Sequence, residues 1–476
     1  MFEKDFYFDI MDNVNSYNCD KYKTDISAFT RKGKLGFGNY TLLPIVSEGR
    51  TNHVEVNSYI RRYMDDNTMT ITKQAESYQR PFIKPEVYQE MILDANVNMM
   101  NAGAYPTGFK GLTVLGCDGS DLDVPPHKIT IDEFNIPSNT LVYKQPAQTL
   151  CSSISDLYNN YIWDITLADA CDDERSIFLE QLNRLDKKIN LENCLFIFDR
   201  GYPSVELFLE LIEKEAYFIF RLPEGKYTKE REKMLSDDEY VNLILNSIRT
   251  NKIRNPSIKE KVKTMTHIRL RIVNIPIKTN NNKTITESLI TNLPPEIANP
   301  QELKMLYGKR WDIEKNYDKM KNILEIENYS GYRKCIIQQD TYAQAFLLNF
   351  LHAIKHDMEK QIPQHKRKSK NGKLRYQINM NTLAGDMIEN MPDLLTDNPE
   401  KRQTTMKYLE ELALSNLSSS KEEKVSYPEI KTLKNTNTNY TKEDPNNTKK
   451  KTIKFKRNNY SKNSYLDSIE KKHYLF

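Results

Sequence analysis

The sequence predicts an α/β fold with a mixed sheet, preceded by a helical region and followed by a basic tail. Between residues 111 and 223, short apolar runs of strand length alternate with stretches of helical spacing. Residues 224–300 are rich in Lys and Asn and carry strand signals at 266–275 and 284–291. Helical patterns resume at 301–324 and 338–359. The strands therefore form one α/β core that a β-rich insertion interrupts.

The individual elements follow from local pattern. Residues 1–110 mix short helical patterns with basic loops. Strands are predicted at 111–124, 149–157 and 162–167, and a helix at 174–190, where Phe178, Leu182 and Leu185 repeat at helical spacing. A strand then ends at Phe198, a helix follows at 204–215, and a strand at 217–222. A last helical stretch ends near Leu417.

Composition indicates a cytoplasmic protein. The chain has 476 residues, of which 28% are charged and 38% hydrophobic, so it can bury a large core. No apolar run approaches the roughly 18–20 residues of a membrane span, and the acidic N-terminus has no signal-peptide pattern. The six cysteines are scattered without a C-x-x-C pair, which favours reduced thiols. We therefore expect no membrane partner.

The charge is unevenly distributed. Residues 421–476 hold 13 Lys and 1 Arg against 7 Asp and Glu, whereas the whole chain has a net charge of only +4. Beyond residue 417 the sequence is rich in Asn, Thr, Ser and Lys and poor in apolar residues, which predicts disorder. A basic tail suits a polyanionic partner. A solvated tail without a target is an equally good interpretation.

Three carboxylates stand out. Asp118 and Asp199 each follow an apolar run of strand length, and Glu314 lies in a predicted helix. Mg²⁺ prefers oxygen ligands, and two such ions about 3.5–4 Å apart can activate an attacking oxygen and stabilise a leaving one. The trio therefore suits phosphodiester chemistry. Asp199 could instead be a turn residue, as could Asp118, which precedes a glycine; Asp121 and Asp123 compete for its role.

A polar stripe surrounds Glu314. On a helical wheel Tyr307, Arg310, Glu314 and Lys321 fall within about 60°, at the border of the buried face. Arg310 and Lys321 would there hold phosphates, the first as a fork and the second as a point charge. A solvated face with ordinary ion pairs is the alternative. It explains the stripe poorly, because Arg310 and Glu314 stand in the less favourable order.

Taken together, these motifs resemble the DDE transposases of bacterial insertion sequences, specifically the insertion-sequence-four family. The residues 115–120 resemble the first-aspartate strand of that family, and 198–202 its second-aspartate motif. Tyr307, Arg310, Glu314 and Lys321 match its Y-R-E-K signature at every spacing. With each residue type at about 5%, four fixed positions recur by chance at about one in 100,000 start points.

The resemblance covers roughly residues 25–400. It implies a ribonuclease-H-like core with Asp118 and Asp199 on adjacent strands, and Mg²⁺ or Mn²⁺ as the cofactor, with two ions per active site. It also implies cleavage at transposon ends and joining to target DNA by a synapsed homodimer. Some members hold a flipped base with a Trp from the insertion, but residues 224–300 contain none. This absence argues against a hairpin intermediate.

The expected organisation has four parts. Residues 1–110 form a helical DNA-binding region, 111–223 with 301–417 the catalytic domain, 224–300 the β-rich insertion and 418–476 the disordered tail. Basic residues outside the signature that could contact double-stranded DNA are Arg31, Lys32, Lys34, Arg61, Arg62 and Arg200. Exposed basic loops without a role are nearly as good an interpretation of the N-terminal ones. Competing functions are a metal-dependent nuclease without strand joining and a catalytically silent DNA-binding protein.

Overall fold

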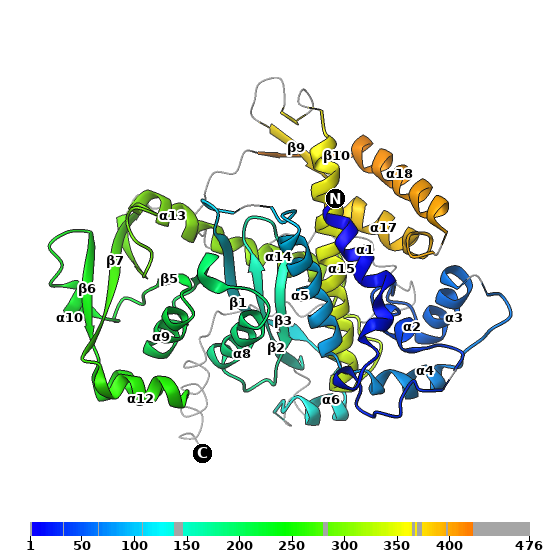
Figure 1. Ribbon diagram of the computed structural model, residues 1–476, viewed down its shortest axis with the longest axis horizontal. Helices are drawn as coiled ribbons and strands as arrows, with labels where there is room; N and C mark the ends of the chain where they lie inside the picture. The colour runs from blue at the N-terminus through cyan, green and yellow to red at the C-terminus, as the bar shows by residue number, and fades with distance from the viewer. Residues whose placement is uncertain are drawn as a thin grey trace, which may run out of the picture. The chain divides into compact units, whose positions relative to one another are not determined.

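An eight-stranded mixed sheet forms the centre of the computed structural model, in the order β3-β2-β1-β4-β5-β8-β7-β6 (Figure 1). The structure describes residues 2–421 except 32, 65, 107, 138–145, 279–283, 364–366, 369–373 and 397. All of these lie in one compact unit, Met1–Tyr427. The predicted disorder of the tail concerns residues that are almost all outside this range. No described helix combines the length and apolar character needed to cross a membrane.

The first five strands have the arrangement expected of a ribonuclease-H-like core. They are β1 (Thr113–Asp123), β2 (Gln148–Asp156), β3 (Ile162–Leu167), β4 (Cys194–Phe198) and β5 (Tyr217–Arg221). β2 pairs antiparallel with β1 and β3, while β4 pairs parallel with β1 and β5. The carboxyl ends of neighbouring parallel strands, here β1, β4 and β5, lie at the same edge of the sheet. This mixed α/β sheet is consistent with the predicted fold class.

The insertion extends this sheet, where the sequence suggested a separate β-rich unit. β8 (Thr284–Thr291) pairs antiparallel with β5 and with β7 (His267–Lys278), and β7 pairs with β6 (Asp238–Ile244). β6 was not predicted, because its residues contain acidic and polar positions that mask the alternation. Three short helices also lie here: α10 (Thr228–Arg231), α11 (Ser247–Thr250) and α12 (Pro256–Thr264).

Apolar side chains cover both faces of the sheet. Along β4, Leu195 and Ile197 join one buried cluster and Phe196 and Phe198 the other, and all five residues of the strand are buried. α8 (Glu174–Asp186) and α9 (Val205–Glu213) pack on the face of the two phenylalanines. Such two-sided burial explains why this strand reads as an unbroken apolar run.

The helices of the other face include both ends of the described chain. α15 (Lys334–Gln361) packs against α1 (Glu3–Asp12), α5 (Glu86–Asn101) and β3 (Figure 1). The remaining helices are α2 (Phe37–Leu42), α3 (Asn52–Tyr63), α4 (Lys73–Gln79), α6 (Lys128–Glu133), α17 (Met380–Leu394) and α18 (Pro399–Ser415), with a small hairpin of β9 (Leu374–Ile378) and β10 (Leu417–Lys421).

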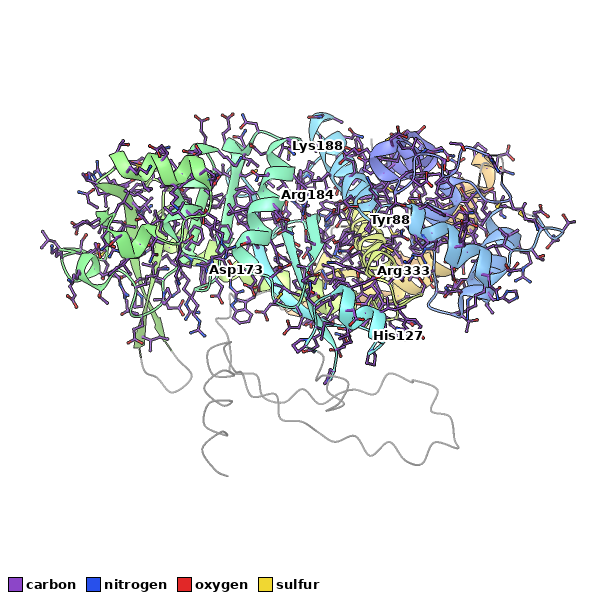
Figure 2. The ribbon with its side chains drawn as sticks, turned by 90° about the horizontal axis from the view of Figure 1, so that it is seen from below. Tyr88, His127, Asp173, Arg184, Lys188 and Arg333 are labelled. Carbon is purple, nitrogen blue, oxygen red and sulfur yellow. The ribbon has the colours of Figure 1, made fainter. Side chains whose placement is uncertain are left out.

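Polar contacts fasten α8 to its neighbours (Figure 2). Arg184 donates to both carboxylate oxygens of Asp164 on β3, at 2.7 and 2.8 Å. Lys188, just beyond the helix, lies 2.8 Å from Asp94 of α5. Since Asp164 is fully buried, its charge needs this bidentate partner. The pair is therefore part of the framework of the sheet.

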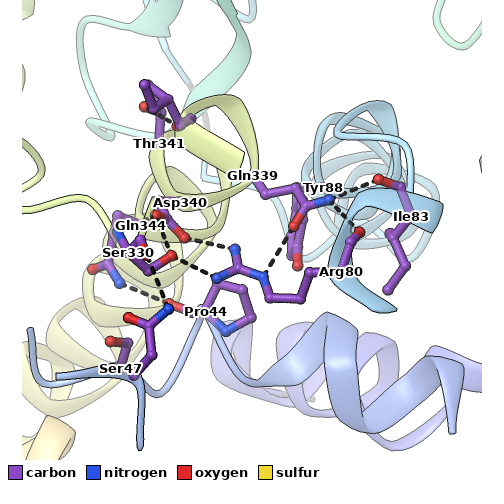
Figure 3. A network of polar contacts seen from close by, with 12 residues as sticks. Pro44, Ser47, Arg80, Ile83, Tyr88, Ser330, Gln339, Asp340, Thr341 and Gln344 are labelled. Carbon is purple, nitrogen blue, oxygen red and sulfur yellow. Dashed lines mark hydrogen bonds and ion pairs between the residues drawn. The ribbon is translucent and has the colours of Figure 1, made fainter. Parts of the chain in front are cut away.

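A buried ionic network joins the N-terminal region to α15 (Figure 3). The Arg80 guanidinium contacts Asp340 at 2.7 Å and Gln339 at 3.1 Å, both on α15. Its third partner, Ser330, precedes the helix and accepts a bond of 2.6 Å. Arg80 is only 2% exposed. Residues 1–110 are thus built into the same core as the sheet.

Candidate active site

The sheet places Asp118 and Asp199 next to each other. In the parallel pairing of β1 with β4, Cys117 is opposite Phe198. Asp118 and Asp199 are the residues that directly follow this pair. Neighbouring strands lie about 4.8 Å apart, and residues at equivalent positions point to the same face. The strand register therefore brings the two carboxylates together.

The surroundings of each aspartate follow from local sequence. Asp118 lies within β1, so its pairing with Gly119 is not a turn. A Cβ on Gly119 would lie 3.0 Å from a Glu174 carboxylate oxygen, so that side chain would have to shift slightly to admit it. Asp199 follows β4, and its carbonyl accepts a hydrogen bond from Tyr202 N in a tight turn. Ser204 then caps α9 by accepting from Leu207 N.

Two helices and a turn carry the Tyr-Arg-Glu-Lys residues, where the sequence predicted one helix at 301–324. α13 (Pro300–Gly308) ends in a 3₁₀ turn (Lys309–Trp311), and α14 (Asp312–Asn322) follows. A weak helix former, Gly308, immediately precedes the break. The 3₁₀ turn therefore interrupts the single continuous helix on which the wheel of Tyr307, Arg310, Glu314 and Lys321 was drawn.

Arg310 joins the carboxylates of the site. Its Nη1 donates to Asp118 Oδ2 at 3.1 Å, and its Nη2 lies 3.5 Å from Glu314 Oε1. The guanidinium also lies over the Trp311 ring, 4.7 Å from its centroid, and the residue is only 4% exposed. Its Nε is buried without a hydrogen-bond acceptor among the described residues. Arg310 thus occupies the space between a strand carboxylate and a helix carboxylate.

Burial shapes the ionisation of the site. Desolvation raises the pKa of Asp118 to about 7, against the attraction of Arg310 and with further repulsion from Asp199 and Glu174. Tyr307, 4% exposed, donates its hydroxyl to Asp199 Oδ1 at 3.2 Å. Burial raises the pKa of Tyr307, so it remains a donor. Several carboxylates thus lie around the Arg310 guanidinium, and carboxylate oxygens are ligands that a divalent cation prefers.

Lys321, the last residue of the Tyr-Arg-Glu-Lys signature, forms a hydrogen bond near the C-terminal end of β1. Lys321 Nζ donates to the Asp121 carbonyl at 2.5 Å and lies 3.7 Å from Glu327. Asp121 and Asp123 are exposed, and in a regular strand they point away from the face of Asp118. The structure therefore groups Asp118, and neither competing aspartate, with Arg310 and Glu314.

Sequence reasoning missed three neighbours of the site. Glu174, at the start of α8, lies close enough to Asp118 to raise its pKa. Glu287 of β8 pairs with Arg221 at 2.5 Å, and Asp199 contributes to its raised pKa. Tyr317 donates to the backbone carbonyl of Asp118 at 3.1 Å. Only Tyr317 carried a signal, as a buried aromatic one turn after Glu314; the other two come from distant elements.

The donor chemistry suits a hard divalent cation, although the carboxylates are not gathered into a ready ligand set. Asp118, Asp199 and Glu314 offer carboxylate oxygens, the ligands that Mg²⁺ and Mn²⁺ prefer. Among the described residues, no group of three or more His, Cys, Asp or Glu is arranged to hold a metal ion. The Arg310 guanidinium instead bridges two of the three. Metal binding to this trio would require Arg310 to shift.

The structure describes all of the other predicted DNA contacts except Lys32. Arg31 and Arg61 are exposed, and Lys34 is exposed but donates to the Thr70 carbonyl at 3.0 Å. Arg62 is partly buried and pairs with Glu48 at 3.1 Å, which occupies its guanidinium within the protein. Arg200 is exposed beside Asp199. Lys32 falls outside the described residues.

Comparison with known families supports the class of protein that this site indicates. The family model described as the transposase DDE domain matches residues 151–350. The matched stretch contains Asp199 and Glu314 but begins after Asp118. This match supports a DDE transposase.

No curated protein matches the sequence. Among solved structures, the chain is similar to the piggyBac transposase in a cryo-EM structure of its synaptic complex with hairpin DNA. The identity is 10% and the TM-score 0.42, and the alignment covers 87% of this chain and 84% of that chain.

Proposed function

We propose that this protein is a DNA transposase that cleaves DNA at transposon ends and joins the freed 3′ end to target DNA. The matched transposase domain supports the class. One geometric observation carries the proposal to this chain: the register of β1 and β4 sets Asp118 beside Asp199, and Arg310 links Asp118 to Glu314. The strand register and Arg310 connect three carboxylates from distant segments of the chain, which supports the proposal.

Each residue has a proposed role. Asp118, Asp199 and Glu314 would hold Mg²⁺ or Mn²⁺, two ions per site, and such ions when bound supply activation of the attacking oxygen and stabilisation of the leaving one. Tyr307 orients Asp199 through its hydroxyl. If Asp118 and Glu314 held metal, the two Arg310 nitrogens that now contact them could donate to a phosphate instead. Lys321 adds a point charge at the end of β1.

The finer assignment follows the sequence resemblance. We propose an insertion-sequence-four member of bacterial origin that acts as a homodimer on terminal inverted repeats in the nucleoid. The proposed organisation keeps residues 1–110 as the end-binding region, 111–223 with 301–417 as the catalytic domain, 224–300 as the insertion and 418–476 as a basic tail. Further phosphate contacts are proposed for Arg31, Lys32, Lys34, Arg61, Arg62 and Arg200.

The test is a cleavage and joining assay with purified protein. The substrate carries the DNA that flanks the coding region on both sides, and the acceptor is a plasmid. We expect Mg²⁺- or Mn²⁺-dependent cleavage followed by joined products. Asp118→Asn, Asp199→Asn and Glu314→Gln should each lose cleavage while retaining DNA affinity. Asp121→Asn, an exposed acid on the same strand, is the matched control and should cut normally.

Other outcomes of this assay identify the alternatives. Cleavage without joined products would indicate a metal-dependent nuclease. DNA binding with no cleavage in either metal would indicate a silent DNA-binding protein. Loss of cleavage in Asp121→Asn together with normal cleavage in Asp118→Asn would contradict the assignment of the first aspartate.

A further inference from the structure

An exposed aromatic stack lies beyond the end of β1. The rings of His127 and Tyr332 are stacked with their centroids 4.4 Å apart and their planes at 14°. Tyr332 is 54% exposed, and His127 is exposed as well. The two residues are 205 positions apart in the sequence, so the tertiary fold creates the pair. Neither residue belongs to the candidate active site.

Polar contacts hold the stack in place. Thr130 of α6 donates its hydroxyl to the Tyr332 carbonyl at 2.7 Å, and Glu133 accepts from Lys334 N at 2.5 Å. His127 Nδ1 accepts from Ile129 N at 3.2 Å and so caps α6. The two rings are therefore ordered before any ligand arrives, which lowers the cost of binding.

Cationic and apolar side chains surround the stack. Lys128 follows His127 and Arg333 follows Tyr332 in the sequence, both are exposed, and Ile129 is 41% exposed (Figure 2 labels His127 and Arg333). Asp132 is an exposed acid on the same helix, while Glu133 is used by the Lys334 backbone. A rigid aromatic surface flanked by Lys and Arg is the combination by which proteins bind nucleobases and the phosphates beside them.

The position of the stack relative to the site limits what it can reach. His127 follows Asp118 by nine residues, which span at most about 30 Å in extended chain. Stacked bases rise about 3.4 Å per nucleotide, so this reach corresponds to at most about nine nucleotides. The stack would therefore contact DNA within about nine nucleotides of the reacting phosphate.

We propose that the His127–Tyr332 stack is a platform for an unpaired base of the bound DNA. This inference rests on the proposed function, since it requires DNA as the partner. Tyr332, which is 54% exposed, takes the base. Arg333 and Lys128 hold the adjoining phosphates. A base inside an intact duplex is stacked on both faces, so the platform selects DNA that is locally unpaired.

The experiment compares two DNA probes in EDTA, where no cleavage occurs. One is a duplex with a single 2-aminopurine in a one-nucleotide bulge, and the other is the fully paired duplex. Tyr332→Ala should weaken binding of the bulged probe about 5- to 150-fold and leave the paired probe unchanged. Quenching of the 2-aminopurine by the wild type should disappear with it. Tyr332→Phe should keep both.

Matched variants complete the design. Tyr408→Ala removes a tyrosine that is 56% exposed on α18 and should change neither probe. His127→Asn keeps a capping side chain but removes the lower ring, so it should weaken only the bulged probe. Arg333→Ala should weaken both probes and flatten the log–log salt dependence by about 0.9.

The possible failures are distinct. If the wild type binds both probes and Tyr332→Ala binds the bulged probe equally well, the platform is overturned while the proposed function stands. If the wild type binds neither probe, both proposals fall. Equal affinity of the wild type for the two probes, with unquenched 2-aminopurine, also overturns the platform.

Discussion

Asp118 is a carboxylate whose ionisation the fold opposes. It lies in a buried strand, and its one direct cation among the described residues, Arg310, is shared with Glu314. A carboxyl group in an unfolded chain has a pKa of about 3.9, whereas desolvation raises that of Asp118 to about 7 in the folded protein. Between these pH values the unfolded chain releases the Asp118 proton, whereas the folded protein still holds it. The metal-free protein therefore loses stability as the pH rises from about 4 to about 7.

Replacing Asp118 should reveal how much its ionisation destabilises the folded protein. We expect Asp118→Asn to stabilise the metal-free protein by an amount that grows from about pH 4 to about pH 7 and is constant above. Urea unfolding in EDTA at several pH values measures it, with Asp121→Asn as the exposed control. Saturating Mn²⁺ should reverse the order, since an ion that binds only the folded wild type stabilises it. A pH-independent difference would show that Asp118 is already ionised at low pH.

Arg310 and Lys321 should respond differently to substitution. The sequence suggested that neither contributes to stability, but Arg310 is buried and holds two carboxylates. Arg310→Met should reduce both DNA cleavage and the melting temperature in EDTA, since it leaves Asp118 without a partner. Lys321→Ala, at a side chain that is 24% exposed, should reduce cleavage with a stability change within about 0.5 kcal/mol. Equal melting temperatures for Arg310→Met and wild type would contradict the ionic role.

At the scale of elements, the join between α14 and the sheet positions the third carboxylate. Tyr317 donates to the carbonyls of Asp118 and Cys151, at 3.1 and 2.9 Å, and so fastens the helix across β1 and β2. The helix begins directly after the 3₁₀ turn that presents Arg310. Displacement of α14 would therefore move Glu314 relative to Asp118.

This contact yields a test of positioning. Tyr317→Phe removes one buried hydroxyl and should cost about 1–3 kcal/mol of stability. Cleavage should fall further than the folded fraction explains at the assay temperature, because Glu314 is no longer held in register. Tyr408→Phe, at an exposed position on another helix, should leave stability and cleavage unchanged. If Tyr317→Phe loses stability but cuts as well as the wild type, the contact serves folding alone.

At the scale of the whole molecule, the N-terminal region cannot be removed to test its role. Tyr7 and Tyr88 are fully buried, and Arg80 bonds to α15. A truncation starting near residue 105 would expose this core and unfold the protein. Point variants of exposed cations, such as Arg31→Ala and Arg61→Ala, are the proper test of end recognition.

A deletion of 422–476 leaves every described residue in the chain. The 12 Lys and 1 Arg of this segment against 7 acidic residues predict non-specific attraction to DNA. Deleting 422–476 should weaken binding to all duplexes similarly and flatten the salt dependence by about 0.9 for each phosphate that the shortened protein no longer neutralises. Binding titrations at several salt concentrations, on transposon ends and on random DNA, measure this. A weakening confined to transposon ends would show that the tail reads sequence.

Local pattern by itself determined the elements of the core. β3 falls at the predicted 162–167, and β1, β4 and α9 lie within two residues of their predicted bounds, because their apolar periodicity is strong and their ends carry turn or cap residues. It also identified Asp118, Asp199 and Glu314 as the candidate trio by motif spacing. The acidic and polar residues of β6 masked its alternation, and the unbroken helical spacing at 301–324 did not reveal the 3₁₀ turn at Lys309–Trp311.

Only the tertiary structure decided which groups meet. The register of β1 and β4 sets Asp118 beside Asp199, and the turn after α13 brings Arg310 between Asp118 and Glu314. Burial then changes the ionisation of Asp118, and no local pattern encodes desolvation by segments more than a hundred residues away. The same holds for the stack of His127 on Tyr332. The sequence by itself thus determined the residue types and the apolar periodicity of each helix and strand, whereas contacts between distant elements depend on how the whole chain packs.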